Sequence, residues 1–212
     1  MGLFESIKRF FVLPEKDADI LKANCFKTDY LAIDLELTGL NAKQDEIVSI
    51  AWVPISHQRI QIGSCQHFIN NQVNNLNQSP VFHGIDSDTL AEGVPLNEAL
   101  KILNELIDDK ILIFHNQELD WSFLRLAFNK AGLLQKPLAI LDTMQIEHKR
   151  LARQGQVIAQ DSLTLNNCRE RYRLPEYSCH NALTDAMATA ELFLAQANQI
   201  SRGKPLLIKH LM

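Results

Sequence analysis

Residues 30–37, Tyr-Leu-Ala-Ile-Asp-Leu-Glu-Leu, form an alternating segment that constrains the fold more than any other part of the chain. In an extended chain its leucine and isoleucine side chains share one side, whereas Ala32, Asp34 and Glu36 share the other. The pattern predicts a strand with one apolar face and two carboxylates on the opposite face. Burying two unpaired carboxylates is costly, because like charges close together raise the pKa of one group sharply, and a divalent cation removes that cost. The alternative is a polar strand face that meets water.

The rest of the chain predicts further strands, followed by strands mixed with helices. Residues 46–55 and 59–69 are rich in β-forming residues, and their short connections to residues 30–37 predict an antiparallel meander. The apolar spacing of 95–109 predicts a helix, and 111–115 is a short apolar run typical of a buried central strand. Further helices are expected at residues 119–131, 142–153, 162–173 and 182–201. This order of elements predicts an α/β domain with a mixed sheet.

Length and composition indicate one globular domain with short extensions. The chain has 212 residues, of which 46% are hydrophobic and 22% charged, as in ordinary globular proteins. We expect a helical N-terminal extension over 1–29, a main domain over 30–203 and a C-terminal tail over 204–212. The four cysteines are scattered without a paired motif, which favours reduced thiols in a cytoplasmic protein. No apolar run has membrane length and no secretory signal is evident, so we expect no membrane association.

The charge of the chain bears on the partners that it can bind. The 21 basic and 25 acidic residues give a formal net charge of −4. A protein that binds nucleic acid is usually basic, so the composition alone argues mildly against such a partner. A cluster of metal-binding carboxylates would reconcile the two observations, because bound cations reverse the local sign of the charge.

Two further places along the chain carry residues with related chemistry. Asp120 follows the predicted strand 111–115, and open α/β sheets place ligands at the carboxyl ends of their strands. The alternative for Asp120 is an acid that only stabilises the start of a helix. His180 and Asp185 form the other place, and five residues within one helix would separate them by about 140°. Both can face one site only if His180 lies in a loop and Asp185 in the first helical turn; otherwise His180 is an ordinary surface or cap residue.

Four carboxylates and one histidine together suit a two-metal site. Hard cations such as Mg²⁺ and Mn²⁺ prefer oxygen ligands. Two such ions about 3.5–4 Å apart can stabilise both the attacking and the leaving oxygen of a phosphodiester. A histidine can take the proton from the attacking water, because its unperturbed pKa lies near 6.5.

The three places resemble, in order, the three motifs of the DEDDh 3′→5′ exonucleases, and the proofreading epsilon subunits of bacterial DNA polymerase III resemble the chain most. The motifs are Asp-Leu-Glu-Leu-Thr-Gly-Leu at 34–40, His-Asn-Gln-Glu-Leu-Asp at 115–120 and His-Asn-Ala-Leu-Thr-Asp at 180–185. Between the first two, residues 82–85 resemble the family's substrate-side segment. The resemblance covers roughly residues 30–200. It implies a ribonuclease H-like fold, with a mixed five-stranded sheet of antiparallel and then parallel strands, flanked by helices.

The resemblance also implies a role for individual residues. It implies that two Mg²⁺ or Mn²⁺ ions bind these four side chains: Asp34, Glu36, Asp120 and Asp185. It implies that His180 is the general base, so that all five residues are catalytic. The terminal nucleotide is expected at Leu37, Thr38, Gly39, Leu40, His83 and Asn116. For His83, a turn histidine that hydrogen-bonds its own loop is an equal alternative. Two departures, Leu37 for Thr and Leu119 for Phe, leave every implied metal ligand in place.

The implied function is metal-dependent removal of nucleotides from a nucleic-acid 3′ end. We expect nucleoside 5′-monophosphates as products, single-stranded or frayed DNA as the favoured substrate, and proofreading or repair as the role. An RNA-processing exoribonuclease is the alternative, because discrimination rests on a few contacts to the 2′-hydroxyl. A catalytically silent binding module would have lost a ligand, and a zinc hydrolase would use more histidine or cysteine. The sequence makes no prediction about a polymerase, another protein partner or an oligomeric state.

Some conspicuous residues fall outside the motifs. Arg169, Arg171 and Arg173 precede the third motif, and phosphate contacts are one interpretation of them. The interpretation that we favour is a solvated helix edge. Trp52 and Trp121 are expected to pack in or near the core rather than to stack on bases.

Overall fold

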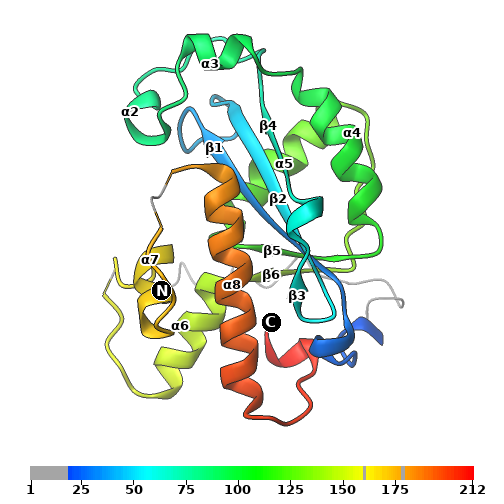
Figure 1. The fold of residues 1–212 in the computed structure, drawn as a ribbon, viewed down its shortest axis with the longest axis vertical. Coiled ribbons are helices and arrows are strands. Elements are labelled where there is room, and N and C mark those ends of the chain that lie inside the picture. Colours follow the sequence, from blue (N-terminus) through cyan, green and yellow to red (C-terminus); the bar gives the residue numbers. More distant parts are fainter. Residues whose placement is uncertain (1–18, 160, 178–179) are drawn as a thin grey trace, which may run out of the picture.

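The computed structural model describes residues 19–159, 161–177 and 180–212 (Figure 1). Most of the expected N-terminal extension lies outside these residues, and its described part contains the short 3-10 helix η2 (Cys25–Lys27). The predicted domain boundaries stay a prediction. In the described part of the chain, no helix combines the length and apolarity needed to cross a bilayer.

Six strands of the described residues form one mixed sheet. They are β1 (Tyr30–Leu37), β2 (Ile47–Ser56), β3 (Arg59–Ile60), β4 (Gln66–Ile69), β5 (Ile111–Phe114) and β6 (Ala139–Asp142). The strand order is β3-β2-β1-β5-β6, and β4 also pairs with β2. The pairs among β1, β2, β3 and β4 are antiparallel, whereas β1–β5 and β5–β6 are parallel. The predicted mixed α/β sheet is therefore confirmed.

The sheet has one strand more than the five that we expected. The segment 59–69 does not form one strand, because the 3-10 turn η3 (Ile62–Ser64) divides it into β3 and β4. Strands β3 and β4 then pair with different parts of β2. The antiparallel half of the sheet is therefore a meander whose expected third strand is divided in two.

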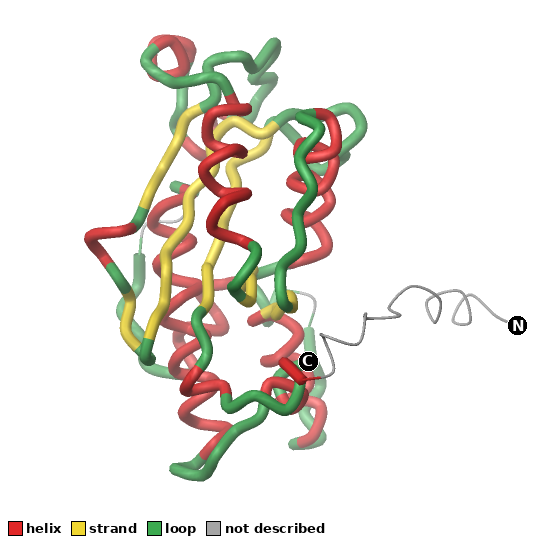
Figure 2. The backbone as a smooth tube through the Cα atoms, turned by 90° about the vertical axis from the view of Figure 1, so that its right-hand side faces the viewer, coloured by secondary structure: helices red, strands yellow, loops and turns green. Residues whose placement is uncertain are grey.

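The helices lie on both sides of the strands (Figure 2). They are α2 (Pro80–His83), α3 (Ser87–Ala91), α4 (Leu96–Ile107), α5 (Gln117–Lys130), α6 (Thr143–Arg153), α7 (Leu165–Arg171) and α8 (Ala182–Ser201). The sequence predicted α4 to α8 to within a few residues, but not the short helices α2 and α3. These two follow the asparagine-rich segment 70–78 and have too few residues for a periodic apolar pattern.

Strand β1 is apolar on both faces over its first half, not on one face as we expected. Leu31 and Ile33 pack with the residues of α4 and α5 in one core. Tyr30 and Ala32 are buried in a second core with α8. Trp52 is fully buried and Trp121 packs against the first core, as predicted. The carboxylates at the end of β1 therefore lie on the face that α8 covers.

Helix α8 lies along the sheet (Figure 1), and it packs closely because the side chains that it presents to the sheet are mostly alanines. The buried alanines of its sheet-facing side are Ala182, Ala186, Ala190 and Ala197. Small side chains let the helix axis approach β1 and β2, and the N-cap residue Asn181 sets where the helix begins. The Asn181 side chain accepts hydrogen bonds from the backbone N–H groups of Leu183 and Thr184, each at 3.2 Å. This start places Asp185 in the first turn.

We expect Ala190→Leu to destabilise the protein by about 1–3 kcal/mol, because the larger side chain overpacks the fully buried contact between α8 and the sheet. The exposed Gln199→Leu on the same helix is the matched control and should leave the midpoint of thermal unfolding nearly unchanged. Equal effects of the two substitutions, measured by circular dichroism, would contradict this account of helix packing.

Candidate metal centre and substrate cavity

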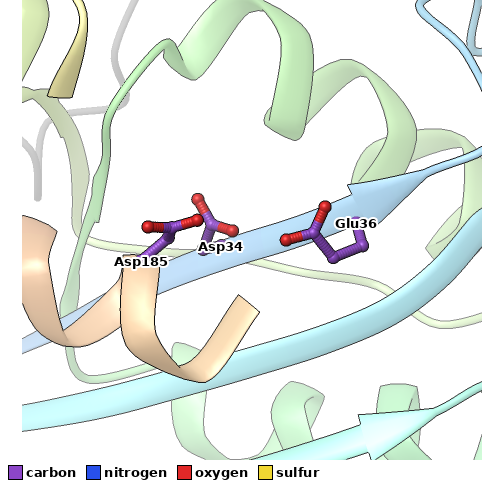
Figure 3. Close-up of side chains that lie close together, drawn as sticks. All are labelled: Asp34, Glu36 and Asp185. Carbon is purple, nitrogen blue, oxygen red and sulfur yellow. The ribbon is translucent and has the colours of Figure 1, made fainter. Parts of the chain in front are cut away.

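Three carboxylates from two elements converge at one end of β1 (Figure 3). Asp34 and Glu36 project from the same face of the strand, and Asp185 reaches them from the first turn of α8. Each side chain offers an oxygen that lies within 4.8 Å of an oxygen of the other two. The alternation of β1 and the starting point of α8 together produce this group of acids.

Asp120 lies beside this group but is not part of it. Its side chain comes from the first turn of α5 and is only 5% exposed. Burial raises the pKa of Asp120 well above its ordinary value, and the nearby carboxylates of Asp142 and Glu36 raise it further. The structure thus brings three of the four predicted ligands together and places the fourth within electrostatic reach of Glu36.

The acids of the site are held where their charged forms are disfavoured. Burial, and then the neighbouring Asp185 carboxylate, raises the pKa of Glu36 from an ordinary value of 4.5 to about 7. Burial also raises the pKa of Asp185, although the backbone N–H of His180 opposes the shift by donating a hydrogen bond to it. Within the described part of the chain, neither Glu36 nor Asp120 forms an ion pair with a basic side chain. An all-oxygen, electrostatically strained donor set of this kind fits Mg²⁺ or Mn²⁺.

His180 lies in the loop just before α8, which is the arrangement that lets it share a site with Asp185. The residue is exposed and adopts a left-handed backbone conformation, with φ of 69°. Its backbone N–H donates to Asp185 Oδ2 at 2.8 Å. The imidazole meets the edge of the Phe82 ring, with 6.4 Å between the ring centroids. His180 is thus tied to the acid group through its backbone, while its ring stays accessible.

A cavity of about 710 Å³ opens beside the carboxylates, and Glu36 and His180 both line it. Five of the six residues predicted to bind the terminal nucleotide also line it: Leu37, Thr38, Gly39, Leu40 and His83. Leu119, one of the two family departures, contributes to the wall as well. Leu40 and Phe82 leave 80% and 66% of their surface exposed, so the walls end in apolar groups that face solvent. The first and third motifs therefore meet in one concave surface.

Asn116 is not among the residues that line this cavity, and its predicted contact with the terminal nucleotide stays a prediction. It precedes α5 in a left-handed conformation, with φ of 85°, and its backbone N–H donates to Asp142 Oδ1 at 3.3 Å. Asn suits this position, because it accepts a left-handed backbone more readily than most residues. Asn116 therefore shapes the turn into the helix that carries Asp120.

The turn after β1 is closed by contacts among its own residues. The backbone N–H of Thr38 donates to the carbonyl of Glu46 at 3.0 Å, and the N–H of Glu46 donates to the Thr38 hydroxyl at 2.9 Å. A Cβ atom at Gly39 would overlap the carboxyl group of Asp45, which accepts a hydrogen bond from the N–H of Asn41. Gly39 is thus required by close packing within the turn, and this packing shapes one wall of the cavity.

His83 both hydrogen-bonds its own turn and lines the cavity. Its Nδ1 accepts a hydrogen bond from the backbone N–H of Ile85 at 3.1 Å, so the proton of the neutral ring resides on Nε2. Burial, followed by the proximity of His180, lowers the pKa of His83 and favours this neutral form. The side chain is 8% exposed, and Nε2 has no hydrogen-bond partner among the described residues. His83 therefore offers a single N–H donor that the fold itself does not use.

Asp142 is a structural residue beside the site, and its contacts were not predicted from the sequence. Its carboxylate accepts hydrogen bonds from the N–H groups of Gln117, at the start of α5, and Met144, at the start of α6, at 3.0 and 2.8 Å. One buried side chain thus caps α6 and holds the beginning of the helix that carries Asp120. An acid between an apolar run and a helix is an N-cap signal, but the link to α5 is not visible in the sequence.

The three arginines before the third motif have different surroundings. Arg169 is 1% exposed, so the predicted solvated edge is wrong for this residue. Its guanidinium donates to the carbonyl of Ala188 at 2.7 Å and forms an ion pair with Glu191 at 2.8 Å. Arg171 and Arg173 are exposed, as predicted, and Arg171 also lies 3.7 Å from the buried carboxylate of Glu147. Packing against α8 explains the burial of Arg169, since α7 lies directly beside that helix.

Comparison with known proteins identifies one family and one fold. The family model described as Exonuclease (RNase_T) matches residues 31–193. A PolC-type DNA polymerase III of Caldanaerobacter subterraneus subsp. tengcongensis is 26% identical over 81% of this chain and 12% of its own length. The 3′-5′ exonuclease DinG of Staphylococcus haemolyticus is 28% identical over 79% of this chain and 18% of its own length. The chain therefore spans less than a fifth of these curated relatives.

Solved structures resemble the chain at lower sequence identity. Cell-death related nuclease 4 (CRN-4) superposes with a TM-score of 0.68 at 15% identity, covering 81% of this chain and 64% of that one. Exonuclease I of E. coli in complex with a dT13 oligonucleotide superposes with a TM-score of 0.67 at 15% identity, covering 79% of this chain and 40% of that one. The ribonuclease H-like fold predicted from the sequence is confirmed by these likenesses.

The raised pKa of Glu36 predicts an unusual pH dependence for the metal-free protein. Between its ordinary pKa of 4.5 and its folded pKa of about 7, the folded protein holds a proton that the unfolded chain has released. The free energy of unfolding therefore falls as the pH rises through that window, because the folded protein binds the proton more tightly than the unfolded chain does. In EDTA-treated protein, raising the pH from about 5 to about 8 should lower the unfolding midpoint more in wild type than in Glu36→Gln.

The exposed Glu98→Gln is the matched control and should follow the wild-type curve. At the upper end of the pH range, added Mg²⁺ should raise the unfolding midpoint of the wild type, because it binds the folded state alone. Identical pH curves for wild type and Glu36→Gln would show that Glu36 is not held in the strained environment described above.

Proposed function

The chain belongs to the exonuclease family, and from this premise we propose that it is a metal-dependent 3′→5′ exonuclease acting on single-stranded or frayed DNA ends. Family membership implies nuclease activity. We propose in addition the 3′→5′ direction of degradation, the DNA substrate and the metal-dependent mechanism. The observation that carries it is the convergence of Asp34, Glu36 and Asp185 within 4.8 Å, beside a cavity that His180 also lines. Acids and a histidine around one concavity are the parts that phosphodiester hydrolysis requires.

The carboxylates would hold two Mg²⁺ or Mn²⁺ ions. Asp34, Glu36, Asp185 and Asp120 would hold the ions, Asp120 from the first turn of α5. When bound, the ions would supply charge stabilisation to the attacking and leaving oxygens of the phosphodiester. The same charge would lower the pKa values of the buried acids and so hold them in the ionised form that binds the metal.

His180 would act as the general base. It would take a proton from the water that attacks the terminal phosphorus, while the 3′ oxygen of the penultimate nucleotide leaves. The product would then be a nucleoside 5′-monophosphate, and the shortened strand would carry a new 3′-hydroxyl. The accessible imidazole supports this role, because it can pass the proton on to solvent, and its backbone hydrogen bond to Asp185 keeps it at the acid group.

The cavity supports a substrate that enters as one unpaired nucleotide. Its volume of about 710 Å³ is in the range of small-molecule sites, which suits a nucleoside monophosphate. The exposed Leu40 and Phe82 offer apolar surface to a base. A paired terminal base must first leave the stack at a cost of a few kcal/mol, which favours single strands and frayed ends.

The names of the relatives support DNA over RNA. They include a PolC-type DNA polymerase III, a 3′-5′ exonuclease, and an exonuclease I that was crystallised with dT13. A role in proofreading or repair is the part of the proposal that follows from these names. We base no prediction on the cellular role, because the chain spans only a small part of the curated relatives.

The activity is tested with 5′-labelled DNA and RNA of one sequence, each single-stranded, with Mg²⁺ or EDTA. We expect a ladder that shortens from the 3′ end, with mononucleotides as products, only when metal is present and fastest on DNA. Asp120→Asn should abolish the ladder, and Glu118→Gln should not, although Glu118 lies in the same helical turn as Asp120. Cleavage of a closed single-stranded circle would refute an exonuclease, and unchanged activity in EDTA would refute the metal dependence.

Substitution of His83 is expected to weaken substrate binding. His83→Asn keeps an oxygen that can accept the hydrogen bond from the Ile85 N–H but lacks a donor at the position of Nε2. We expect this variant to raise KM about tenfold at unchanged kcat, the effect of one lost hydrogen bond. His83→Gln, whose amide can replace the Nε2 donor, should bind DNA better than His83→Asn. Wild-type KM in His83→Asn would limit the role of His83 to its own turn.

A further inference from the structure

Arg169 joins three segments of the chain at one buried point. It belongs to α7, and its guanidinium donates to the carbonyl of Ala188 on α8 at 2.7 Å. The same group donates to the carbonyl of Pro175, in the loop that leaves α7, at 2.9 Å. An ion pair with Glu191 at 2.8 Å completes the contacts with α8. Burying a cation so completely costs free energy unless its donors are used. Here the two terminal nitrogens of the guanidinium are used and fasten a loop onto a helix, whereas Nε has no hydrogen-bond partner among the described residues.

Tyr177 is the second fastening of this loop. The Arg169 guanidinium lies 4.6 Å from the centre of the Tyr177 ring, within the range of a cation–π contact. The Tyr177 hydroxyl donates to Glu191 Oε1 at 2.9 Å, while the other oxygen of that carboxylate accepts from Arg169. Arginine, glutamate and tyrosine therefore form a closed set of three mutual contacts, which holds the tyrosine against α8.

His180 follows Tyr177 by only three residues. Three residues of chain span at most about 11 Å, so fixing Tyr177 restricts where His180 can lie. On the other side, the His180 N–H is bonded to Asp185, and Asn181 caps α8. The base-bearing residue thus lies between two attachments to the same helix, one on each side.

We propose that Arg169, Glu191 and Tyr177 form a clamp that positions His180 over the carboxylates. The inference rests on the proposed function, because the clamp matters for catalysis only if His180 is the general base. These three are positioning residues, since none of them lines the cavity. A general base is effective only within hydrogen-bond reach of the proton that it removes, so a loosened loop should slow the chemical step and leave substrate binding intact.

The chain offers a closely matched control for this clamp. Tyr172 donates through its hydroxyl to Glu147 at 2.7 Å, and the Arg150 guanidinium lies 5.5 Å from its ring centre. The same three residue types thus meet on the other side of α7, against α6. Tyr172→Leu removes equivalent contacts outside the segment that leads to His180. It therefore measures the effect on cleavage of losing such a set of tyrosine contacts elsewhere in the fold.

The experiment is a double-mutant cycle read by single-turnover cleavage of single-stranded DNA at saturating Mg²⁺. We expect Tyr177→Leu to slow cleavage roughly 10- to 100-fold, as small displacements of a reacting group do, with unchanged affinity for DNA and Mg²⁺. Tyr172→Leu should cleave at the wild-type rate. The double variant Tyr177→Leu/His180→Ala should be no slower than His180→Ala alone, because the position of an absent base is irrelevant. If Tyr177→Leu does not fold, Tyr177→Phe and Tyr172→Phe form the corresponding pair.

The outcomes separate the clamp from the function on which it rests. A slow His180→Ala beside a normal Tyr177→Leu would overturn the clamp and leave the proposed function standing. Losses that multiply in the double variant, or an equal loss in Tyr172→Leu, would also overturn the clamp, because the effect would then not pass through His180. A normal rate in His180→Ala would refute the general base and, with it, the purpose of the clamp.

Discussion

Repulsion among buried carboxylates is the constraint on which the rest of this structure depends. Asp34, Glu36 and Asp185 place carboxylate oxygens within 4.8 Å of one another, and burial together with the Asp185 carboxylate disfavours the ionised form of Glu36. They are held together by a strand that is buried on both faces and by a helix that packs on it through alanine. The hydrophobic packing of β1 and α8 therefore offsets an electrostatic cost that protonation of Glu36 or a bound cation reduces.

The parts of the site that the sequence predicted are those set by local periodicity. The alternation of residues 30–37 predicted that Asp34 and Glu36 share a face, and the helical repeat required His180 to lie in a loop and Asp185 in the first turn. Both are relations between residues no more than five positions apart. The mixed sheet was predicted in the same way, from the order of strands and helices, although the break between β3 and β4 was not.

The parts that the sequence did not predict depend on contacts between distant segments. Asp142 holds the start of α5 through a hydrogen bond to a residue 25 positions away, and no local pattern contains that information. The prediction for Arg169 was wrong for the same reason, because its partners on α8 are 19 and 22 positions away. The left-handed backbone of Asn116 at the start of α5 was likewise not visible in the motif that contains it.

Helix α7 lies between the second and third motifs along the chain, and His115, the first residue of the second motif, contacts a residue two positions before this helix. His115 meets the Leu163 carbonyl at 2.9 Å, and because a carbonyl can only accept, Nε2 carries the proton. Burial lowers the pKa of His115 and keeps the ring neutral. This hydrogen bond fixes the chain just before α7, and Arg169 fastens the chain just after it. His115 and Arg169 thus hold the two ends of α7, the helix from which the proposed clamp on His180 extends.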